Sequence, residues 1–189
     1  MAAGLHASLF DTAFGRCALA WSEQGLTAVR LPAASDAQTL AALTGRSVGG
    51  SVACDVPVTP PSDWPDFVHR AVADIQAHLL GQPRELLDLP LDMSGTPDFE
   101  RRVWLEARKL APGQTCTYGE LARELGEPGA MRAVGQALGH NPWPLVVPCH
   151  RVLAAGGKLG GFSAPGGSET KRRLLVLEAG MVRREGQLF

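Results

Sequence analysis

The chain has 189 residues, of which 45% are hydrophobic and 20% charged, the usual balance of a folded globular protein, and this excludes a wholly disordered chain. No apolar run approaches the length of a membrane-spanning helix, and the N-terminus lacks the pattern of a secretory signal. The four cysteines, at spacings of 37, 62 and 33 residues, form neither a disulfide framework nor a metal-binding CxxC pair. We therefore expect a reduced, cytoplasmic protein without a membrane segment.

The net charge of −1 hides an asymmetry between the two halves of the chain. Residues 1–95 hold five basic and ten acidic side chains, whereas residues 96–189 hold thirteen basic and nine acidic ones. A surface that meets phosphate groups is therefore expected in the second half.

The first half begins with short alternating segments at Ser8–Phe10, Arg16–Trp21 and Leu26–Arg30. Turn-forming residues separate them, which predicts a small antiparallel meander. Gly45–Pro61 is rich in Gly, Ser, Val and Pro without any period, and it is predicted to be a loop.

A helical period follows this loop. Apolar residues recur at helical spacing, with Asp63 as the candidate N-cap and Gly81 beyond the end; they are Val68, Val72, Ile75 and Leu79. Leu86–Met93 is a candidate last strand. The first half is thus predicted to be α+β.

The second half is predicted to be mainly helical. Ser94–Asp98 resembles a linker in which Thr96 caps a helix and Pro97 lies in its first turn; the apolar face of that helix is Phe99, Val103, Ala107 and Leu110, with Pro112-Gly113 as the stop. A last helix is expected at about Glu169–Ala179, capped by Ser168 and ended by Gly180.

Two further helices are predicted at Tyr118–Leu125 and Met131–Leu138, joined by Gly126–Ala130. This is the pattern of a helix-turn-helix, although a plain helical hairpin fits the spacing equally well. Small residues make the second helix slim, which suits close approach to a groove; they are Ala130, Ala133, Gly135, Ala137 and Gly139.

The most informative segment is Asn141–Val152, in which three prolines surround a short apolar stretch, expected to be a strand, that ends at Cys149. A free thiol is only a few per cent ionised at neutral pH, so a nucleophilic cysteine needs a base or a cation nearby. His150 and Arg151 follow directly, but neighbours on a strand point to opposite faces. From these residues alone, a buried structural cysteine is the more common reading.

The wider pattern resembles the O6-alkylguanine–DNA alkyltransferase family. Three motifs carry the resemblance: Pro-Cys-His-Arg-Val at 148–152, Arg-Ala-Val-Gly at 132–135 and Tyr-Gly-Glu-Leu-Ala at 118–122. It covers about Phe99 to Ala179 and extends more weakly to Asp11–Leu31. The resemblance implies two domains, a small ribonuclease H-like α+β domain at 1–94 and a mainly helical, winged-helix-like domain with the helix-turn-helix at 95–189.

The resemblance also implies roles for single residues. Cys149 matches the alkyl acceptor, His150 the base that deprotonates it through a water, and Glu178 the carboxylate that orients this histidine, the logic of a triad. Asn141 matches the residue that pins the turn before the acceptor. Further matches are substrate or DNA contacts, with Arg132 filling the gap left by a flipped base in a minor-groove complex; they are Tyr118, Arg132, Ala133, Gly135, Arg151, Val152 and Ser163.

A glycine-rich segment and a basic segment follow the acceptor motif. Gly156–Gly167 lacks the Gly-Lys-Ser/Thr of a phosphate loop, and it fits better as a wall of the guanine pocket. Phe162 stands where the family often has tyrosine, and Ala164-Pro165 lengthens the segment. Lys171–Arg173 is predicted to be a solvated face, although Lys171 matches a lysine near the family's active site.

No metal or cofactor is expected. Some family members bind a structural zinc, but the matching positions here are Ser22 and Thr27. The other histidines show no ligand spacing and are interpreted as surface or satisfied side chains; they are His6, His69, His78 and His140. Cys17, Cys54 and Cys116 are interpreted as inert small apolar residues.

The resemblance implies direct repair of O6-methylguanine, and of O4-methylthymine, in double-stranded DNA by a monomer that accepts one alkyl group on Cys149. Three alternatives remain at this point. A damage-flagging protein lacks the acceptor cysteine, a transcriptional regulator needs an effector domain, and a cysteine hydrolase needs a peptide or ester pocket. Each predicts a different result with methylated DNA.

Overall fold

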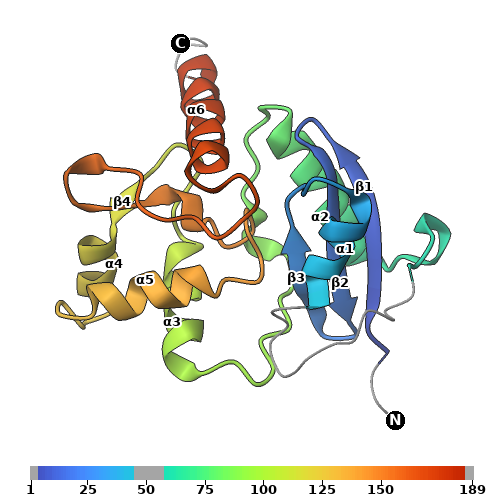
Figure 1. The fold of residues 1–189 in the computed structure, drawn as a ribbon, viewed down its shortest axis with the longest axis horizontal. Helices are drawn as coiled ribbons and strands as arrows, with labels where there is room; N and C mark the ends of the chain where they lie inside the picture. Colours follow the sequence, from blue (N-terminus) through green and yellow to red (C-terminus); the bar gives the residue numbers. More distant parts are fainter. Residues whose placement is uncertain (1–3, 45–57, 186–189) are drawn as a thin grey trace.

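The computed structural model describes residues 4–44 and 58–185 (Figure 1). Cys54 and most of the loop predicted at Gly45–Pro61 lie outside these ranges. The described chain mixes small sheets with helices, as the α+β prediction requires. Figure 1 shows the N-terminal sheet with α1 and α2 on one side of the molecule, and α3, α4 and α5 on the other.

The N-terminal sheet is an antiparallel meander of β1 (His6–Thr12), β2 (Gly15–Ser22) and β3 (Gly25–Arg30), which confirms the prediction. Gly25, with φ of 148°, allows the tight approach of Pro90 to the start of β3, because a Cβ at this position would lie 2.6 Å from the Pro90 carbonyl oxygen.

The two faces of the sheet carry side chains of different size. One face is lined by alanines and packs against Leu40 and Leu43 of α1 (Asp36–Thr44), a helix that the sequence did not predict. The other face carries larger side chains such as Leu19 and Trp21, and it packs against α2. Because both faces are covered, β2 is buried on both sides.

Helix α2 (Asp66–Leu79) confirms the predicted amphipathic helix, but its start differs. The N-cap is Pro65, and Asp63 lies instead in the short 3-10 turn η1 (Pro61–Asp63), because two prolines in this stretch fix an extended backbone before α2. Gly81 lies just beyond the end with φ of 85°, as the sequence predicted.

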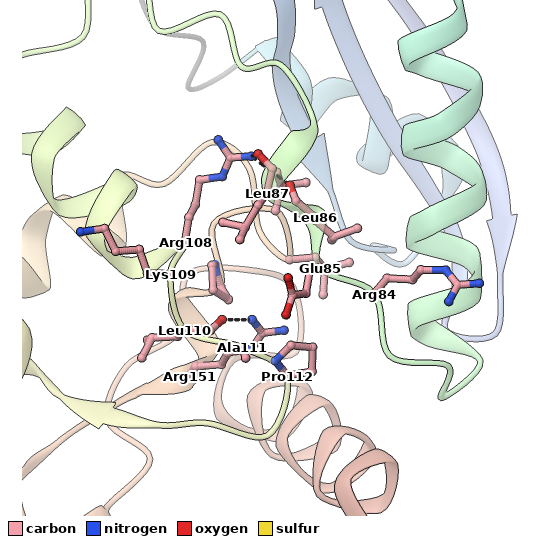
Figure 2. Close-up of a pocket in the computed structure, with 13 residues that line it drawn as sticks. Arg84, Glu85, Leu86, Leu87, Arg108, Lys109, Leu110, Ala111, Pro112 and Arg151 are labelled. Carbon is pink, nitrogen blue, oxygen red and sulfur yellow. Dashed lines mark hydrogen bonds between the residues drawn. The ribbon is translucent and has the colours of Figure 1, made fainter. Parts of the chain in front are cut away.

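The strand predicted at Leu86–Met93 is wrong. This segment forms the 3-10 turn η2 (Leu86–Asp88) and then a single bridge from Leu91 to Leu26. The Arg108 guanidinium donates to the carbonyl oxygens of Leu86 and Leu89 at 2.9 and 3.1 Å, whereas the Pro90 carbonyl accepts from the Leu26 N–H of β3 at 2.9 Å. Figure 2 shows Arg108 reaching this turn.

The second half holds α3 (Asp98–Ala107), α4 (Tyr118–Glu124), α5 (Met131–Gly139) and α6 (Gly167–Glu185), all near predicted positions. Strands β4 (Cys116–Thr117) and β5 (Val152–Leu153) pair in parallel beside them.

Several predicted helix ends in this half are wrong. Ser168 lies inside α6, which already begins at Gly167, and α3 ends at Ala107, before the predicted stop at Pro112-Gly113. Thr96 does not cap α3, whose N-cap is Pro97. Gly180 does not end α6, which continues to Glu185, because a glycine within a helix costs only about 1 kcal/mol and the buried Met181 follows it.

The α4–α5 pair confirms the two predicted helices joined by a short turn. Thr117 accepts a hydrogen bond from the backbone N–H of Glu120 at 3.2 Å, and the Glu120 carboxylate accepts one from the Thr117 N–H at 2.6 Å. This capping box fixes the start of α4 within four residues of sequence.

The main core is continuous across both halves, from Phe10 and Ile75 in the first to Trp104 and Trp143 in the second. The rings of Trp104 and Trp143 meet edge to face with centroids 5.3 Å apart. In the described part of the chain, no helix combines the length and the apolar character needed to cross a membrane.

Candidate active site

The segment before Cys149 is not the strand that the sequence suggested. It holds a single bridge between Pro144 and Val147, and Leu145 has a positive φ of 76°. Cys149 then opens the 3-10 turn η3 (Cys149–Arg151). The three prolines of the segment lack the N–H groups that a strand ladder needs, so a compact turn forms instead.

Strand β3 of the N-terminal half holds this turn in place. The Pro142 carbonyl accepts hydrogen bonds from the Val29 N–H at 2.8 Å and from the Arg30 guanidinium at 2.7 Å. The Trp143 indole N–H donates to the Leu26 carbonyl at 2.8 Å. The acceptor segment is therefore anchored by residues more than 100 positions away in the sequence.

Asn141 joins the turn to the thiol. Its Nδ2 donates to the Val147 carbonyl at 2.9 Å and to Cys149 Sγ at 3.2 Å, while its Oδ1 accepts from the Trp143 N–H at 2.9 Å. One amide thus fixes both the backbone turn and the position of the sulfur atom, the arrangement expected for a residue that pins this turn.

The Cys149 thiol is buried, with 7% of the residue exposed. Burial raises the pKa of Cys149 above that of a free thiol, although the Asn141 hydrogen bond and the Lys171 charge act in the opposite direction. The thiol therefore keeps its proton at neutral pH, and any reaction at sulfur requires a base.

His150 and Glu178 form a fully buried pair next to this thiol in the chain. His150 Nε2 lies 2.9 Å from Glu178 Oε1, and both residues are 0% exposed. Burial lowers the pKa of His150, and the hydrogen bond to Glu178 only partly opposes this, so the ring is neutral. Because a carboxylate only accepts, Nε2 carries the ring proton and the Nδ1 lone pair is left for an incoming proton.

Glu178 holds its negative charge strongly. Burial by itself would raise its pKa, but hydrogen bonds from His150, His78 and Arg151 outweigh burial and hold the pKa of Glu178 far below its usual range. The Gly113 N–H also donates to Oε2 at 3.1 Å. The ionised Glu178 carboxylate is therefore the common acceptor for all of these donors.

The structure contradicts the expectation that Arg151 contacts DNA. As a DNA contact it would need an exposed guanidinium, but only 5% of the residue is exposed. Its Nε and NH2 donate to Glu178 at 2.9 and 2.7 Å, and its NH1 donates to the Leu110 carbonyl (Figure 2). Arg151 therefore compensates the buried carboxylate and is not available to meet DNA.

Lys171 corrects a second expectation, because it is fully buried and not part of a solvated face. Its Nζ donates to the carbonyl oxygens of Val152 at 2.7 Å and Gly161 at 3.3 Å, and it lies 6.0 Å from the centre of the Tyr118 ring. Burial lowers the pKa of Lys171. Lys171 thus ties the 156–167 loop to β5 and brings a positive charge toward Cys149.

Two cavities meet at Cys149. One, of about 270 Å³, is lined by Tyr118, Gly135, Phe162 and Ser163. The other, of about 430 Å³, shares Phe162 and Ser163 and extends past Pro165 toward Arg30. The thiol is thus the point where two spaces meet, one beside the helix pair and one beside the N-terminal sheet.

A third cavity, beside η2 and the segment after α3, does not serve this site. Figure 2 shows it between Arg84 and Lys109, with Arg151 at its base. Its volume of about 20 Å³ admits about one water molecule, and Cys149 does not line it.

The helix pair presents the remaining residues singled out by the sequence. Arg132 is exposed near the start of α5, and Ala133 and Gly135 are half-buried on it. Tyr118 opens α4 and lies against α5, since a Cβ at Gly135 would come within 3.9 Å of its ring. Burial raises the pKa of the Tyr118 hydroxyl, and Cys149 adds to this.

His78 is a site residue that the sequence analysis missed. It lies in the last turn of α2, is 1% exposed, and its Nε2 lies 2.9 Å from Glu178 Oε1. Its place on the buried face of the amphipathic helix was visible in the sequence, but its partner 100 residues away was not.

The chain is similar to known proteins over most of its length. Residues 98–180 match the family model described as 6-O-methylguanine DNA methyltransferase, DNA binding domain. A methylated-DNA–protein-cysteine methyltransferase of Mycobacterium tuberculosis is 46% identical over 125 residues, which are 66% of this chain and 73% of that protein. One from Methanosarcina acetivorans is 32% identical over 92% of this chain and 98% of that protein.

Solved structures extend the similarity to the whole fold. The crystal structure of Mycobacterium tuberculosis OGT in complex with DNA has a TM-score of 0.73 at 36% identity, covering 93% of this chain and 94% of that one. The O6-methylguanine-DNA methyltransferase of Pyrococcus kodakaraensis has a TM-score of 0.63 at 29% identity, covering 92% and 98%. On the sequence motifs, the fold and these relatives together, the chain belongs to the methylated-DNA–protein-cysteine methyltransferase family.

Proposed function

We propose that this protein repairs alkylated double-stranded DNA directly, by transferring the alkyl group from O6 of guanine, and from O4 of thymine, to its own Cys149. The observation that carries the proposal is the position of Cys149. Its thiol lies where two cavities meet, held by Asn141 and followed in the chain by the base His150, which is bonded to Glu178.

The chemistry requires a proton acceptor for the thiol, and the neutral His150 ring supplies it. As sulfur attacks, the S–C bond forms while the C–O6 bond breaks, and the bonding electrons leave with the guanine, which takes up a proton. The product thioether has no good leaving group, so each molecule acts once and needs no cofactor or metal. Tyr118 and Lys171, next to the smaller cavity, are suited to neutralise the departing base.

DNA recognition is assigned to the helix pair. O6 lies inside the base stack, so the damaged nucleotide has to be flipped out, at a cost of a few kcal/mol. Arg132 is exposed at the start of α5 and can fill the gap, while the small side chains of α5 allow close approach to the minor groove. The smaller cavity beside Tyr118 and Gly135 then receives the base. Ser163 and the backbone at Val152 are the proposed contacts to the edges of this base.

We propose two domains with different roles: residues 1–94 support the site, and residues 95–189 bind DNA and carry the acceptor. A monomer is proposed, and it is supported by the thiol, its Asn141 contact and the His150–Glu178 pair, which come together within a single chain. The protein works in the cytoplasm, where an acceptor thiol stays reduced; the free thiols of Cys17, Cys116 and Cys149 are in keeping with this.

The test is intact mass after incubation with duplex DNA containing O6-methylguanine, compared with Cys149→Ser. We expect a gain of about 14 Da, one methylene, on the Cys149 peptide and at most one per molecule. Tight lesion binding by folded protein without any mass change would instead favour a damage-flagging protein. Neither binding nor transfer would contradict both.

A further inference from the structure

We propose that His78, contributed by the N-terminal half, is a positioning residue for alkyl transfer that acts through Glu178 on His150. This inference rests on the proposed function only where the rate of alkyl transfer is interpreted. Its structural basis is that the rings of His78 and His150 share a single carboxylate oxygen, each with Nε2 2.9 Å from Glu178 Oε1.

The contacts of Glu178 show why this histidine matters. Oε1 accepts from His78, His150 and the NH2 of Arg151, and Oε2 accepts from the Nε of Arg151 and the N–H of Gly113. A carboxylate offers about four lone-pair positions, so these donors saturate it and leave no freedom of rotation. Without His78, the oxygen that orients His150 loses one of its fixed partners.

The same contacts fix which nitrogen of each ring donates a hydrogen bond. Because Glu178 is ionised and only accepts, His78 and His150 both donate through Nε2–H. Within the described residues, the Nδ1 atom of each ring has no hydrogen-bond partner. The charged groups that meet in the cluster are Glu178 and Arg151, which cancel. A proton arriving at His150 Nδ1 therefore creates an imidazolium charge, and Glu178 Oε1, the oxygen that also accepts from His78, stabilises this charge through the His150 Nε2–H.

Two effects follow for a variant that lacks the His78 donor. The His150 ring loses orientation, which lowers the maximal rate of transfer. In addition, Oε1 loses a competing donor and stabilises the His150 imidazolium more strongly, so the Cys149 thiolate forms at lower pH. A residue that only filled space would produce neither change in a folded variant.

The position also joins the two halves of the molecule. His78 is at the end of α2, whereas Glu178 is in α6 and His150 in η3. The bond therefore makes the catalytic carboxylate sensitive to the docking of the N-terminal half, beyond the backbone support that β3 gives to Pro142.

The experiment compares His78→Leu, which removes the donor, with His78→Gln, which keeps an N–H donor without a titratable ring. His69→Gln, an exposed histidine on the same helix, is the matched control. Each full-length variant is first checked for a cooperative thermal transition. Cys149 reactivity toward iodoacetamide is then followed against pH at the level of the Cys149 peptide, together with the single-turnover rate on O6-methylguanine DNA.

We expect His78→Leu to lose roughly tenfold in transfer rate, the usual scale for a partner that orients a reacting group. Its iodoacetamide profile should shift to lower pH, while His78→Gln and His69→Gln stay close to the unaltered protein. In a Glu178→Gln background, His78→Leu should cause little further loss, because both changes remove the same interaction.

Three results would overturn the proposal: a folded His78→Leu with unchanged rate and pH profile, a His78→Gln as defective as His78→Leu, or losses from His78→Leu and Glu178→Gln that simply add. The iodoacetamide arm requires no DNA. It therefore tests His78 even if the unaltered protein fails to transfer an alkyl group, which would count against the proposed function alone.

Discussion

The α4–α5 pair lies within the second half of the chain, whereas the cluster around Glu178 joins both halves through His78, and the two regions are held together in different ways. The helix pair is stabilised by contacts between near neighbours in sequence, such as the capping box of Thr117 and Glu120, and it presents Arg132 to water. The Glu178 cluster gathers buried polar and charged groups from α2, η3, α6 and the segment at Gly113.

The difference predicts how each region responds to damage. Exposed, local interactions contribute about 1 kcal/mol each and fail one at a time. Buried charges are costly to leave unpaired, so the loss of one member of the cluster affects all the others. Four changes, taken from the largest expected effect to the smallest, test this contrast.

Glu178→Gln should damage the cluster most. It leaves the Arg151 guanidinium buried without its carboxylate and should lower the free energy of unfolding by about 3–5 kcal/mol, measured by urea denaturation. Alkyl transfer should fall with it, since His150 loses the charged acceptor that stabilises its imidazolium, and the Gln amide offers a single uncharged oxygen in its place. A variant as stable as the unaltered protein would show that the cluster is no more cooperative than the surface.

Acid should weaken the same cluster in two stages. The pKa of His150 is lowered by burial, so the unfolded chain takes up its proton first and stability begins to fall below about pH 6.5. The pKa of Glu178 is held far below its usual range, so a second loss begins near pH 4.3 and continues as the pH falls. Urea denaturation at several pH values measures both, and the second stage should be smaller in Glu178→Gln.

Arg132→Ala should affect DNA repair without touching the cluster. The side chain is exposed, so stability should change by less than about 0.5 kcal/mol. The single-turnover rate on double-stranded DNA should fall by roughly tenfold or more, because flipping of the damaged base costs a few kcal/mol. Reactivity of Cys149 toward iodoacetamide should stay unchanged; a change there would mean that the two regions are coupled.

Thr117→Ala should have the smallest effect. It removes the side-chain acceptor of the capping box and should cost about 1 kcal/mol in urea denaturation. Transfer by the remaining folded protein should stay near normal. A loss as large as that of Glu178→Gln would contradict the view that the helix pair is held by local, additive contacts.

Cysteine chemistry sharpens the comparison further. Burial raises the pKa of both Cys17 and Cys116 to about 11, and acidic side chains of α4 add to the shift at Cys116. Cys149 is also buried, but it alone of these three has Asn141 bonded to its sulfur and Lys171 nearby to oppose the effect. The surroundings, and not burial alone, distinguish the acceptor from the inert thiols.

Patterns in the sequence were enough to predict the elements that depend on near neighbours. Alternation predicted the β1–β3 meander, apolar spacing predicted α2, and the short motif around Gly126 predicted the α4–α5 pair, because backbone preferences and caps act over a few residues. The motif at 148–152 likewise carried the family, since the acceptor and its base are adjacent in the chain.

Which charges are buried together depends on contacts between residues that lie far apart in the sequence. The sequence predicted a DNA contact for Arg151, a solvated face for Lys171 and an ordinary histidine at His78. In the structure all three are buried, and His78 and Arg151 contact Glu178. The same holds for Leu86–Met93, whose carbonyl partner is the distant Arg108. The donors that bind a carboxylate are those that lie close to it in space, and no local pattern in the sequence indicates a partner 100 residues away.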